Sequence, residues 1–311
     1  MRSRPVVAVI LLGGAVLGGL AFRIAPSASQ TAEEASYVGS AACAECHEGI
    51  EHSFRLNGHG RAEEDSALVE GRTGCESCHG PGSLHVAADS DPEDPGFHVI
   101  RSFHPKMDQA EANAPCLTCH TGEAQMHWQE SAHDDRGIKC VDCHSMHEPQ
   151  DPSRKALLKA ENTSDLCMTC HKTKRMQMSR SAHMPVLEGG MDCSSCHEPH
   201  GSTTPKNLKA NSVNELCESC HMDKRGPMLF DHAPVRENCL NCHEPHGANN
   251  QRSLAAKTPF LCQRCHVATR HPSTLYDGPD LASNRLFNRS CLNCHSQVHG
   301  SNHPSGKYFL R

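Results

Sequence analysis

Ten copies of the pattern Cys-x-x-Cys-His run through this chain of 311 residues, and together they use every one of its 20 cysteines. In each copy the two thiols are three residues apart on a short helical turn, so they face the same way with the imidazole beside them. This pattern is typical of c-type haem attachment, in which two thioether bonds hold the porphyrin edge and the histidine reaches the iron. The sequence therefore predicts ten covalently bound haem c groups.

The predicted attachment residues are Cys43, Cys46, Cys75, Cys78, Cys116, Cys119, Cys140, Cys143, Cys167, Cys170, Cys193, Cys196, Cys217, Cys220, Cys239, Cys242, Cys262, Cys265, Cys291 and Cys294. The predicted proximal ligands to iron are the histidines that follow, namely His47, His79, His120, His144, His171, His197, His221, His243, His266 and His295.

Zinc sites and disulfides are the two alternatives for these cysteines. Cys-x-x-Cys pairs also build tetrahedral zinc sites, and an even cysteine count in an exported chain would suit disulfides. Neither alternative requires a histidine directly after the second cysteine, and the whole chain has only 25 histidines. A histidine in that position in every copy favours haem.

The composition argues against an ordinary hydrophobic core. Hydrophobic residues make up 37% of the chain and aromatic residues only 4%, with Trp128 as the single tryptophan. Such a chain buries too little apolar surface to offset the entropy of ordering it, so the porphyrins must supply the missing bulk. We expect a mostly irregular fold with short α-helices and almost no β-sheet, and a largely unfolded apoprotein. Short helical patches are predicted at Lys155–Ala160 and Asn214–Leu216.

Residues 1–30 have the pattern of a signal peptide. Arg2 and Arg4 form a basic start, and Val6–Phe22 is an apolar run that is short for a membrane span. An uncleaved membrane anchor is the alternative. In either case the remainder crosses a membrane, as haem attachment outside the cytoplasm requires. The net charge of −6 and the lack of a basic cluster argue against a nucleic-acid partner.

Further histidines recur at regular offsets from the motifs, with about fifty residues for every two motifs after the first pair. Ten of them would complete bis-histidine coordination of every iron, and we predict as distal ligands His59, His85, His133, His147, His183, His200, His232, His246, His271 and His299. His303 is an alternative to His271 or His299. His52, His98, His104 and His127 have no counterpart in the repeat and are interpreted as surface or loop histidines.

His147, His200 and His246 each lie three residues after a proximal histidine. Each is therefore on the same side of that porphyrin, whereas the sixth ligand must approach from the opposite face. We predict that these three ligate a neighbouring haem, which would hold the porphyrins close together as a wire.

Methionine is the alternative axial ligand, and its coordination raises the potential of a haem. Six methionines lie within reach of the motifs, but none recurs at a fixed offset, so packing is the better interpretation. They are Met126, Met168, Met178, Met184, Met191 and Met228.

Several segments besides the motifs carry a family resemblance. These are the tail CLNCHSQVHGSNHPSG at Cys291–Gly306, CHGPG at Cys78–Gly82, WQESAH at Trp128–His133, RGP at Arg225–Pro227 and HAPV at His232–Val235. With ten motifs in the same order, the chain resembles the decahaem c-type cytochromes of the DmsE/MtrA family. The resemblance covers essentially the whole mature chain and implies an elongated multihaem fold. It also implies two tandem pentahaem-like halves, at 37–185 and 186–311.

The resemblance implies a position in the periplasm, with the protein partly threaded inside a large outer-membrane β-barrel porin. There it would pass electrons between a periplasmic or inner-membrane cytochrome and an extracellular multihaem cytochrome or terminal reductase. Six-coordinate iron has no position for substrate, so we predict an electron-transfer protein and not an enzyme.

Two other functions remain as alternatives. One is a soluble periplasmic electron shuttle that needs no porin. The other is a multihaem oxidoreductase of the nitrite or hydroxylamine type. Such nitrite reductases typically carry lysine in place of one motif histidine, and no Cys-x-x-Cys-Lys occurs in this chain.

Overall fold

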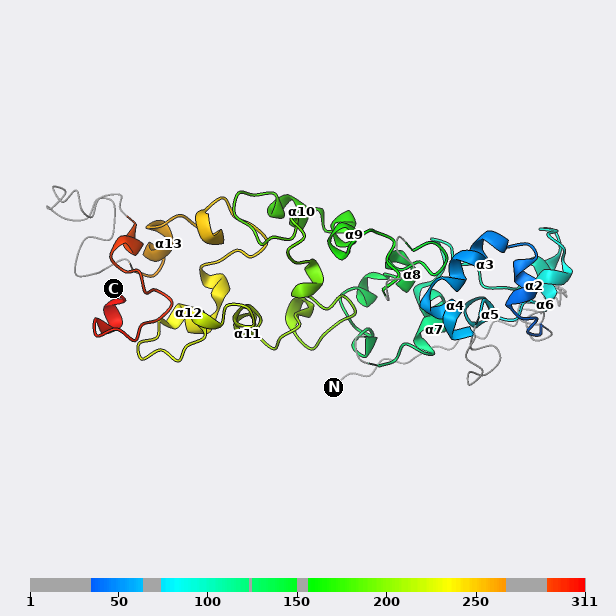
Figure 1. Ribbon diagram of the computed structural model, residues 1–311, viewed down its shortest axis with the longest axis horizontal. Helices are drawn as coiled ribbons and strands as arrows, with labels where there is room; N and C mark the ends of the chain where they lie inside the picture. Colours follow the sequence, from blue (N-terminus) through cyan, green and yellow to red (C-terminus); the bar gives the residue numbers. More distant parts are fainter. Residues whose placement is uncertain (1–34, 64–73, 123–124, 150–155, 267–289, 311) are drawn as a thin grey trace, which may run out of the picture.

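The protein is a long, narrow molecule in which the chain advances from one end to the other (Figure 1). The computed structural model describes residues 35–63, 74–122, 125–149, 156–266 and 290–310. The predicted signal peptide, residues 1–30, lies outside the described residues. Helix α2 (Ser40–Ala44) is at one end of the long axis and α13 (Phe260–Gln263) is at the other.

Every Cys-x-x-Cys-His motif closes one helical turn. In all ten copies the histidine N–H donates to the carbonyl oxygen of the first cysteine, at 2.9–3.1 Å. Odd-numbered motifs begin within α2, α7 (Gln109–Leu117), α9 (Thr163–Cys170), α11 (Val213–Glu218) and α13. Even-numbered motifs occupy single turns, namely α5 (Glu76–His79), α8 (Cys140–Cys143), η4 (Cys193–Ser195), η7 (Cys239–Asn241) and η9 (Cys291–Asn293).

The remaining elements are also short. They are α3 (Glu48–Arg55), α4 (Gly58–Glu63), α6 (Ser83–Ala87), η1 (Pro95–His98), η3 (Asp134–Arg136), α10 (Lys172–Met178), η5 (Pro205–Asn207), η6 (Met222–Lys224), α12 (Ala233–Glu237), η8 (Gln251–Ser253) and η10 (Gly306–Tyr308). Strand pairing in the described segments is limited to isolated bridges. The prediction of short helices with almost no sheet is confirmed.

Polar caps start three of the helices that carry odd-numbered motifs, α7, α9 and α11. The side chain of Asn162 accepts a hydrogen bond from the N–H of Asp165 at the start of α9, and Ser212 does the same for Glu215 at the start of α11. These bonds satisfy amide groups that a first helical turn leaves without partners. In α9 and α11 the helix therefore begins at the same distance before its first cysteine.

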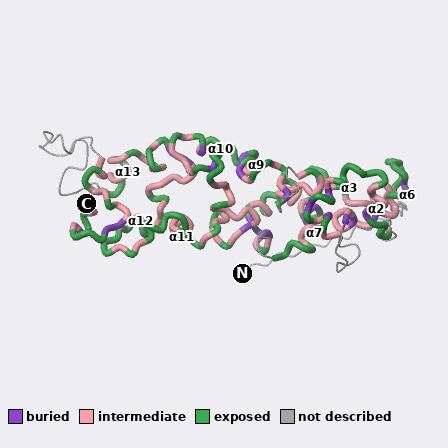
Figure 2. Tube along the Cα trace, in the orientation of Figure 1, coloured by how far each residue is buried: buried purple, intermediate pink, exposed green. Residues whose placement is uncertain are grey.

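Buried residues are scattered along the molecule and do not form one core (Figure 2). The described hydrophobic cluster consists of Met168, Met178 and Val186, with Met184 and Met191 packed against it. These four methionines pack against apolar side chains, as the sequence interpretation expected of them. The polypeptide has no central core, in keeping with its composition.

The even-numbered motifs share a closed loop. Bridges join the proximal histidine to a leucine that follows it, in the pairs His144–Leu158, His197–Leu208 and His243–Leu254. The predicted helical patch at Lys155–Ala160 is wrong, because residues 156–160 form this bridge and Leu157 takes a left-handed φ of 47°. The patch at Asn214–Leu216 is confirmed within α11.

Within the described ranges no helix is long and apolar enough to cross a membrane. The division into halves at 37–185 and 186–311 stays a prediction. Contacts cross that boundary, since the Nδ1 of His133 donates to the carbonyl oxygen of Pro199 at 2.7 Å.

Gly247 is required where two loops meet. Its φ is +129°, and an added Cβ would lie 2.0 Å from the carbonyl oxygen of Gln177. Gly247→Ala is therefore expected to lower the free energy of unfolding of the holoprotein by about 1–3 kcal/mol, the typical size of such backbone strain. Denaturant titration followed by haem absorbance measures it. Gly49→Ala is the control, because no atom lies within 4 Å of its added Cβ. An unchanged midpoint for Gly247→Ala would contradict the expectation.

Candidate functional site

Imidazole rings meet in pairs along the molecule. Among the described residues, seven proximal histidines face a second histidine with ring centroids 5.8–6.2 Å apart. The pairs are His59–His120, His79–His147, His133–His171, His144–His200, His197–His246, His232–His266 and His243–His299. Metal–imidazole bonds are about 2 Å long, so two rings that share one metal ion have centroids about 6 Å apart. The spacing fits one iron between each pair.

Two opposite series generate these pairs. A histidine that follows an even-numbered motif faces the proximal histidine two motifs earlier, as His200 faces His144 and His246 faces His197. A histidine that follows an odd-numbered motif faces the proximal histidine two motifs later, as His133 faces His171. Each distal histidine therefore pairs with the proximal histidine two motifs away from the motif that it follows. Motif spacing alone did not reveal this register.

The Nδ1 atoms of many of these histidines are hydrogen-bonded to the backbone. Nδ1 donates to a main-chain carbonyl oxygen at 2.6–2.9 Å in His79, His85, His133, His197, His232, His243 and His295. The same bond forms between His144 and Ala156. A proton on Nδ1 leaves the Nε2 lone pair free to bind a metal and fixes the ring orientation.

Burial keeps several of these imidazoles neutral. It lowers the pKa of His79, and the neighbouring charges of Arg101, His47 and His85 lower it further against the effect of its backbone hydrogen bond. Burial also lowers the pKa of His147, with its partner His79 as the next cause. The neutral form is the one that ligates iron, so the environment favours ligation.

The other predicted distal ligands have different positions. His183 donates from Nδ1 to the carbonyl of Arg180, and its Nε2 lies 2.9 Å from the carboxylate of Glu188. His85 contacts Phe97, and His271 lies outside the described residues. His299 faces His243, which favours it over His303 as a candidate ligand. The predicted surface histidines His52, His98 and His104 are exposed, whereas the half-buried His127 lines a cavity.

Successive motifs meet through their cysteines. At each odd-to-even junction the first cysteine of the even-numbered motif raises the pKa of the first cysteine of the odd-numbered one, in the pairs Cys43–Cys75, Cys116–Cys140, Cys167–Cys193, Cys217–Cys239 and Cys262–Cys291. Burial and the neighbouring Cys75 raise the pKa of Cys43 to about 11. At each even-to-odd junction a cysteine of the next motif raises the pKa of the second cysteine, in Cys78–Cys119, Cys143–Cys170, Cys196–Cys220 and Cys242–Cys265. At all nine junctions the cysteines of successive motifs are therefore near enough to affect each other's pKa.

Neither a disulfide nor a zinc-type cluster is present among the residues that the structure describes. All twenty cysteines are free of disulfide bonds. No group of three or more His, Cys, Asp or Glu side chains that could hold a metal ion occurs in the part of the chain that the structure describes. Structural zinc requires four such ligands, whereas the imidazoles here meet in twos.

Two buried donors near the paired histidines fit the carboxylates of a porphyrin. The indole N–H of Trp128 has no acceptor, although the side chain is only 6% exposed, and its ring lies 6.4 Å from that of His200. The buried Nε of Arg101 likewise has no acceptor, while its Nη1 donates to the carbonyl of Cys78 at 2.6 Å. A buried donor without a partner is costly, and a propionate would satisfy either one. Sequence reasoning missed both residues.

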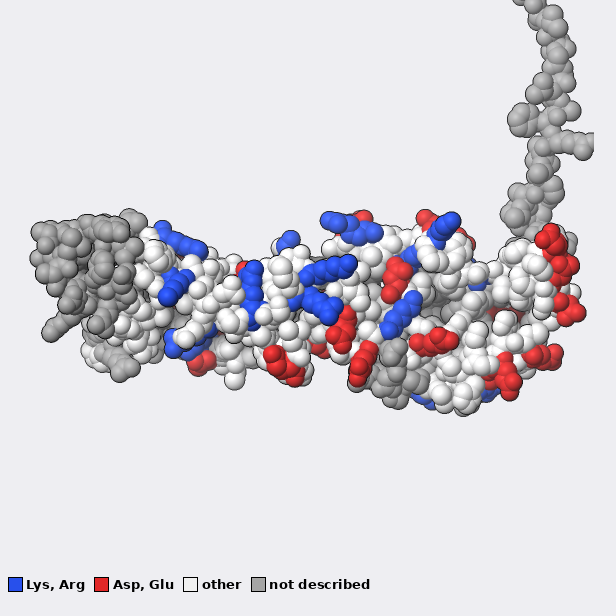
Figure 3. Space-filling view, turned by 90° about the horizontal axis from the view of Figure 1, so that it is seen from above, with Lys and Arg blue, Asp and Glu red and all other residues white. Residues whose placement is uncertain are grey.

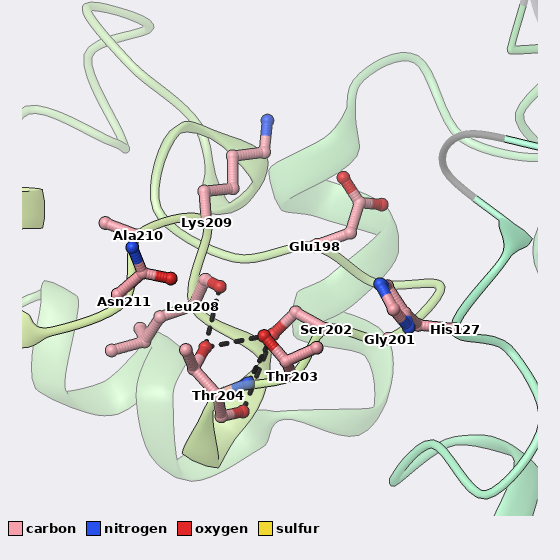
Figure 4. A pocket seen from close by; sticks show the side chains of 10 residues that line it. All are labelled: His127, Glu198, Gly201, Ser202, Thr203, Thr204, Leu208, Lys209, Ala210 and Asn211. Atoms are coloured by element: carbon pink, nitrogen blue, oxygen red, sulfur yellow. Dashed lines mark hydrogen bonds between the residues drawn. The ribbon is translucent and has the colours of Figure 1, made fainter.

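A cavity of ≈ 420 Å³ is lined by Glu198 and by the loop from Gly201 to Thr204, which follow motif six (Figure 4). His127 lies next to Gly201 at its border, and the hydroxyls of Ser202 and Thr204 are 3.0 Å apart. A smaller cavity of ≈ 260 Å³ occupies the corresponding place in the next repeat, beside Arg180 and Glu244. The cavities thus follow the histidine repeat.

Comparison with known proteins defines the class first. The family described as "Doubled CXXCH motif" matches residues 133–176, 183–226 and 232–271. Each match begins at a predicted distal histidine and contains an even-numbered motif followed by an odd-numbered one. The repeats and paired histidines are those of a multihaem c-type cytochrome, with haems bound covalently through these motifs.

Two curated relatives then give the family. The chain is 38% identical to the multihaem cytochrome MtrA of Shewanella baltica over 88% of this chain and 81% of the relative. It is 27% identical to the cytochrome c-type protein NrfB of Escherichia coli over 48% of this chain and 74% of that protein. The chain belongs to the MtrA family of multihaem cytochromes, and it is an electron-transfer protein, not an enzyme.

One solved structure also matches, the undecahaem cytochrome from the S-layer of Carboxydothermus ferrireducens. The match has 20% identity and a TM-score of 0.14 and covers 77% of this chain but 32% of that one. The chain thus spans about a third of its length, and so low a score supports no argument.

Trp128→Phe keeps a buried ring and removes only the N–H donor. We expect the midpoint potential of one haem to fall by about 20–60 mV, because a propionate without this donor favours the oxidised iron, and 59 mV corresponds to about 1.4 kcal/mol for one electron. Potentiometric titration followed in the visible spectrum measures it. Tyr37→Phe, at an exposed aromatic residue, is the control. A titration curve of Trp128→Phe that superimposes on that of the wild type would exclude the role.

Proposed function

We propose that the chain binds ten haem c groups, one at each motif, with histidine on both faces of every iron. The seven ring pairs support seven of these sites directly. The same register pairs His183, which follows motif five, with the proximal His221 of motif seven. Two distal candidates then have no motif two places away: His85, which follows motif two, and His271, which follows motif nine. We assign His85 to the proximal His47 and His271 to the proximal His295.

When bound, the porphyrin irons supply one-electron chemistry. The chain's own part is to close both axial positions and to hold the imidazoles in one tautomer through the backbone bonds of residues such as His79 and His243. An iron closed in this way has no open position for substrate. The proposed role is therefore electron transfer along the whole chain.

The observation that carries this proposal is that elements bearing successive motifs pack against each other along the molecule. Helix α5 packs against α7, α7 against α8, α9 against η4 and α11 against η7. A thioether would join each cysteine to a porphyrin edge, so motifs that pack together would bring neighbouring porphyrin edges together. A path of short steps thus follows the long axis of the molecule.

We further propose that this path crosses the outer membrane inside a large β-barrel porin, from the periplasm to the cell exterior. Membership of the MtrA family and the narrow, elongated shape support this function. The proposed partners are the porin, a periplasmic or inner-membrane cytochrome and an extracellular multihaem cytochrome or terminal reductase. On the face shown in Figure 3, Asp and Glu gather at the N-terminal end, whereas Lys and Arg are more frequent elsewhere. Such a difference suits different partners at the two ends.

Liposomes with a trapped redox dye test the conduit. The holoprotein is co-expressed with its candidate porin, the complex is reconstituted, and a membrane-impermeant reductant is added outside. We expect the dye to be reduced only when cytochrome and porin are both present. A protein that stays entirely in the soluble fraction, without a barrel partner, would support the periplasmic shuttle instead.

His147→Ala tests the pairing of His147 with His79. We expect one haem to change from low-spin to high-spin iron, because its distal ligand is lost while both thioether bonds remain. Electron paramagnetic resonance of the oxidised protein measures the spin state, and pyridine haemochrome analysis should still give ten haems per chain. His104→Ala, at an exposed histidine, should remain fully low-spin. A fully low-spin spectrum of His147→Ala would refute this pair.

A further inference from the structure

A polar side chain three residues before the first cysteine of an odd-numbered motif reaches the next motif. Ser40 Oγ accepts a hydrogen bond from the N–H of Cys75 at 3.1 Å. Asn113 Oδ1 accepts one from Cys140 at 2.8 Å. Asn214 Oδ1 accepts one from Cys239, also at 2.8 Å. In each case the donor is the first cysteine of the following even-numbered motif.

The other two odd-to-even junctions carry related contacts. Ser164, at the same position before motif five, has its Oγ 3.8 Å from the thiol of Cys193. Before motif nine the position is occupied by Pro259, and the neighbouring Thr258 bonds through its hydroxyl to that of Ser290 at 3.0 Å. Ser290 directly precedes the first cysteine of motif ten. All five odd-to-even junctions are thus bridged by polar side chains.

These side chains are shielded from water. Ser40, Asn113 and Ser164 are 7%, 2% and 6% exposed. A buried backbone N–H without an acceptor is costly, so each acceptor holds its cysteine amide firmly. Asn214 is bonded on its other side as well, because its amide donates to the carbonyl oxygens of Val235 and Arg236 at 2.9 and 3.1 Å.

The three-residue spacing explains how this side chain can reach the next motif. Residues three apart on a helix lie on one face, so Asn113 lies on the same face of α7 as Cys116. Its bond to the Cys140 amide fixes the turn that carries the Cys140 thiol, and this turn, α8, packs against α7. The side chain therefore sets how closely the attachment points of two successive porphyrins approach.

We propose that Ser40, Asn113, Ser164 and Asn214 are positioning residues at the first four odd-to-even junctions, and that Thr258 and Ser290 take this role at the fifth. These residues fix the separation of the two haems at each junction and so set the rate of electron transfer there. This inference rests on the proposed function, since it requires haem at every motif. It divides the path into five clamped pairs, 1–2, 3–4, 5–6, 7–8 and 9–10.

Asn113→Ala is the primary test, in the holoprotein. We expect ten haems and a fully low-spin spectrum, a loss of hydrogen-exchange protection at the Cys140 amide, and a weaker magnetic interaction between haems three and four in the paramagnetic resonance spectrum. We also expect end-to-end electron transfer to slow by roughly tenfold, since displacing reacting groups by about 1 Å is enough for losses of this order. Asn113→Ser should restore part of the rate, because serine serves at two other junctions.

Two further variants separate this role from a merely structural one. Asn162→Ala removes a helix cap of α9 that bonds Asp165 and no cysteine, and it should leave the magnetic interaction unchanged. Asn214→Ala makes the same test at haems seven and eight, where the side chain is only half-buried. It covers the case in which Asn113→Ala fails to fold.

Normal transfer and an unchanged magnetic interaction in Asn214→Ala or Asn113→Ala would overturn the proposal. So would equal changes at all haem pairs, which would indicate a general loss of structure. If the wild type itself does not conduct from end to end, the proposed function fails. The magnetic interaction of haems three and four still decides the positioning role in that case.

Discussion

The structure depends on pairs of imidazoles that come from segments far apart in the sequence and meet about 6 Å apart. His133 and His171, for example, lie on opposite sides of motif four, and His144 faces His200 beyond motif five. One metal ion between each pair, as proposed, would replace the contacts that a hydrophobic core would otherwise supply. Every such link would join motifs two apart. The links would therefore overlap and hold a chain with little buried apolar surface in one extended shape.

Distal histidines after odd-numbered motifs pair forward along the chain and those after even-numbered motifs pair backward, and this leaves the first and last motifs without a partner two motifs away. Inside the chain each motif receives a ligand from two motifs away, in the forward direction for odd-numbered motifs and in the backward direction for even-numbered ones. The first and last motifs have no such neighbour, so the proposal assigns His85 to His47 and His271 to His295. With these two assignments and that of His183 to His221, the proposed register would use all ten predicted distal histidines for ten motifs.

Local features were predictable from the sequence, and distant ones were not. The helical turn of each motif and the candidates for distal ligands follow from spacing within a few residues. The pairing register does not, because it depends on which loops lie side by side, as Gly247 lies against Gln177. The expected helix at Lys155–Ala160 fails for the same reason, since the bridge from Leu158 to His144 overrides local helix propensity. Trp128 and Asn113 could be found only from burial and hydrogen bonding.

Axial closure and contact between motifs, as proposed above, would together restrict where electrons can enter and leave. Inside the path each haem would lie between neighbours on both sides, whereas the haems of the first and tenth motifs of this chain would each have a neighbour on one side. Electrons would therefore enter and leave at these two haems. The acidic side chains at the end that carries α2 and α6 (Figure 3) would give that entrance a charge of its own.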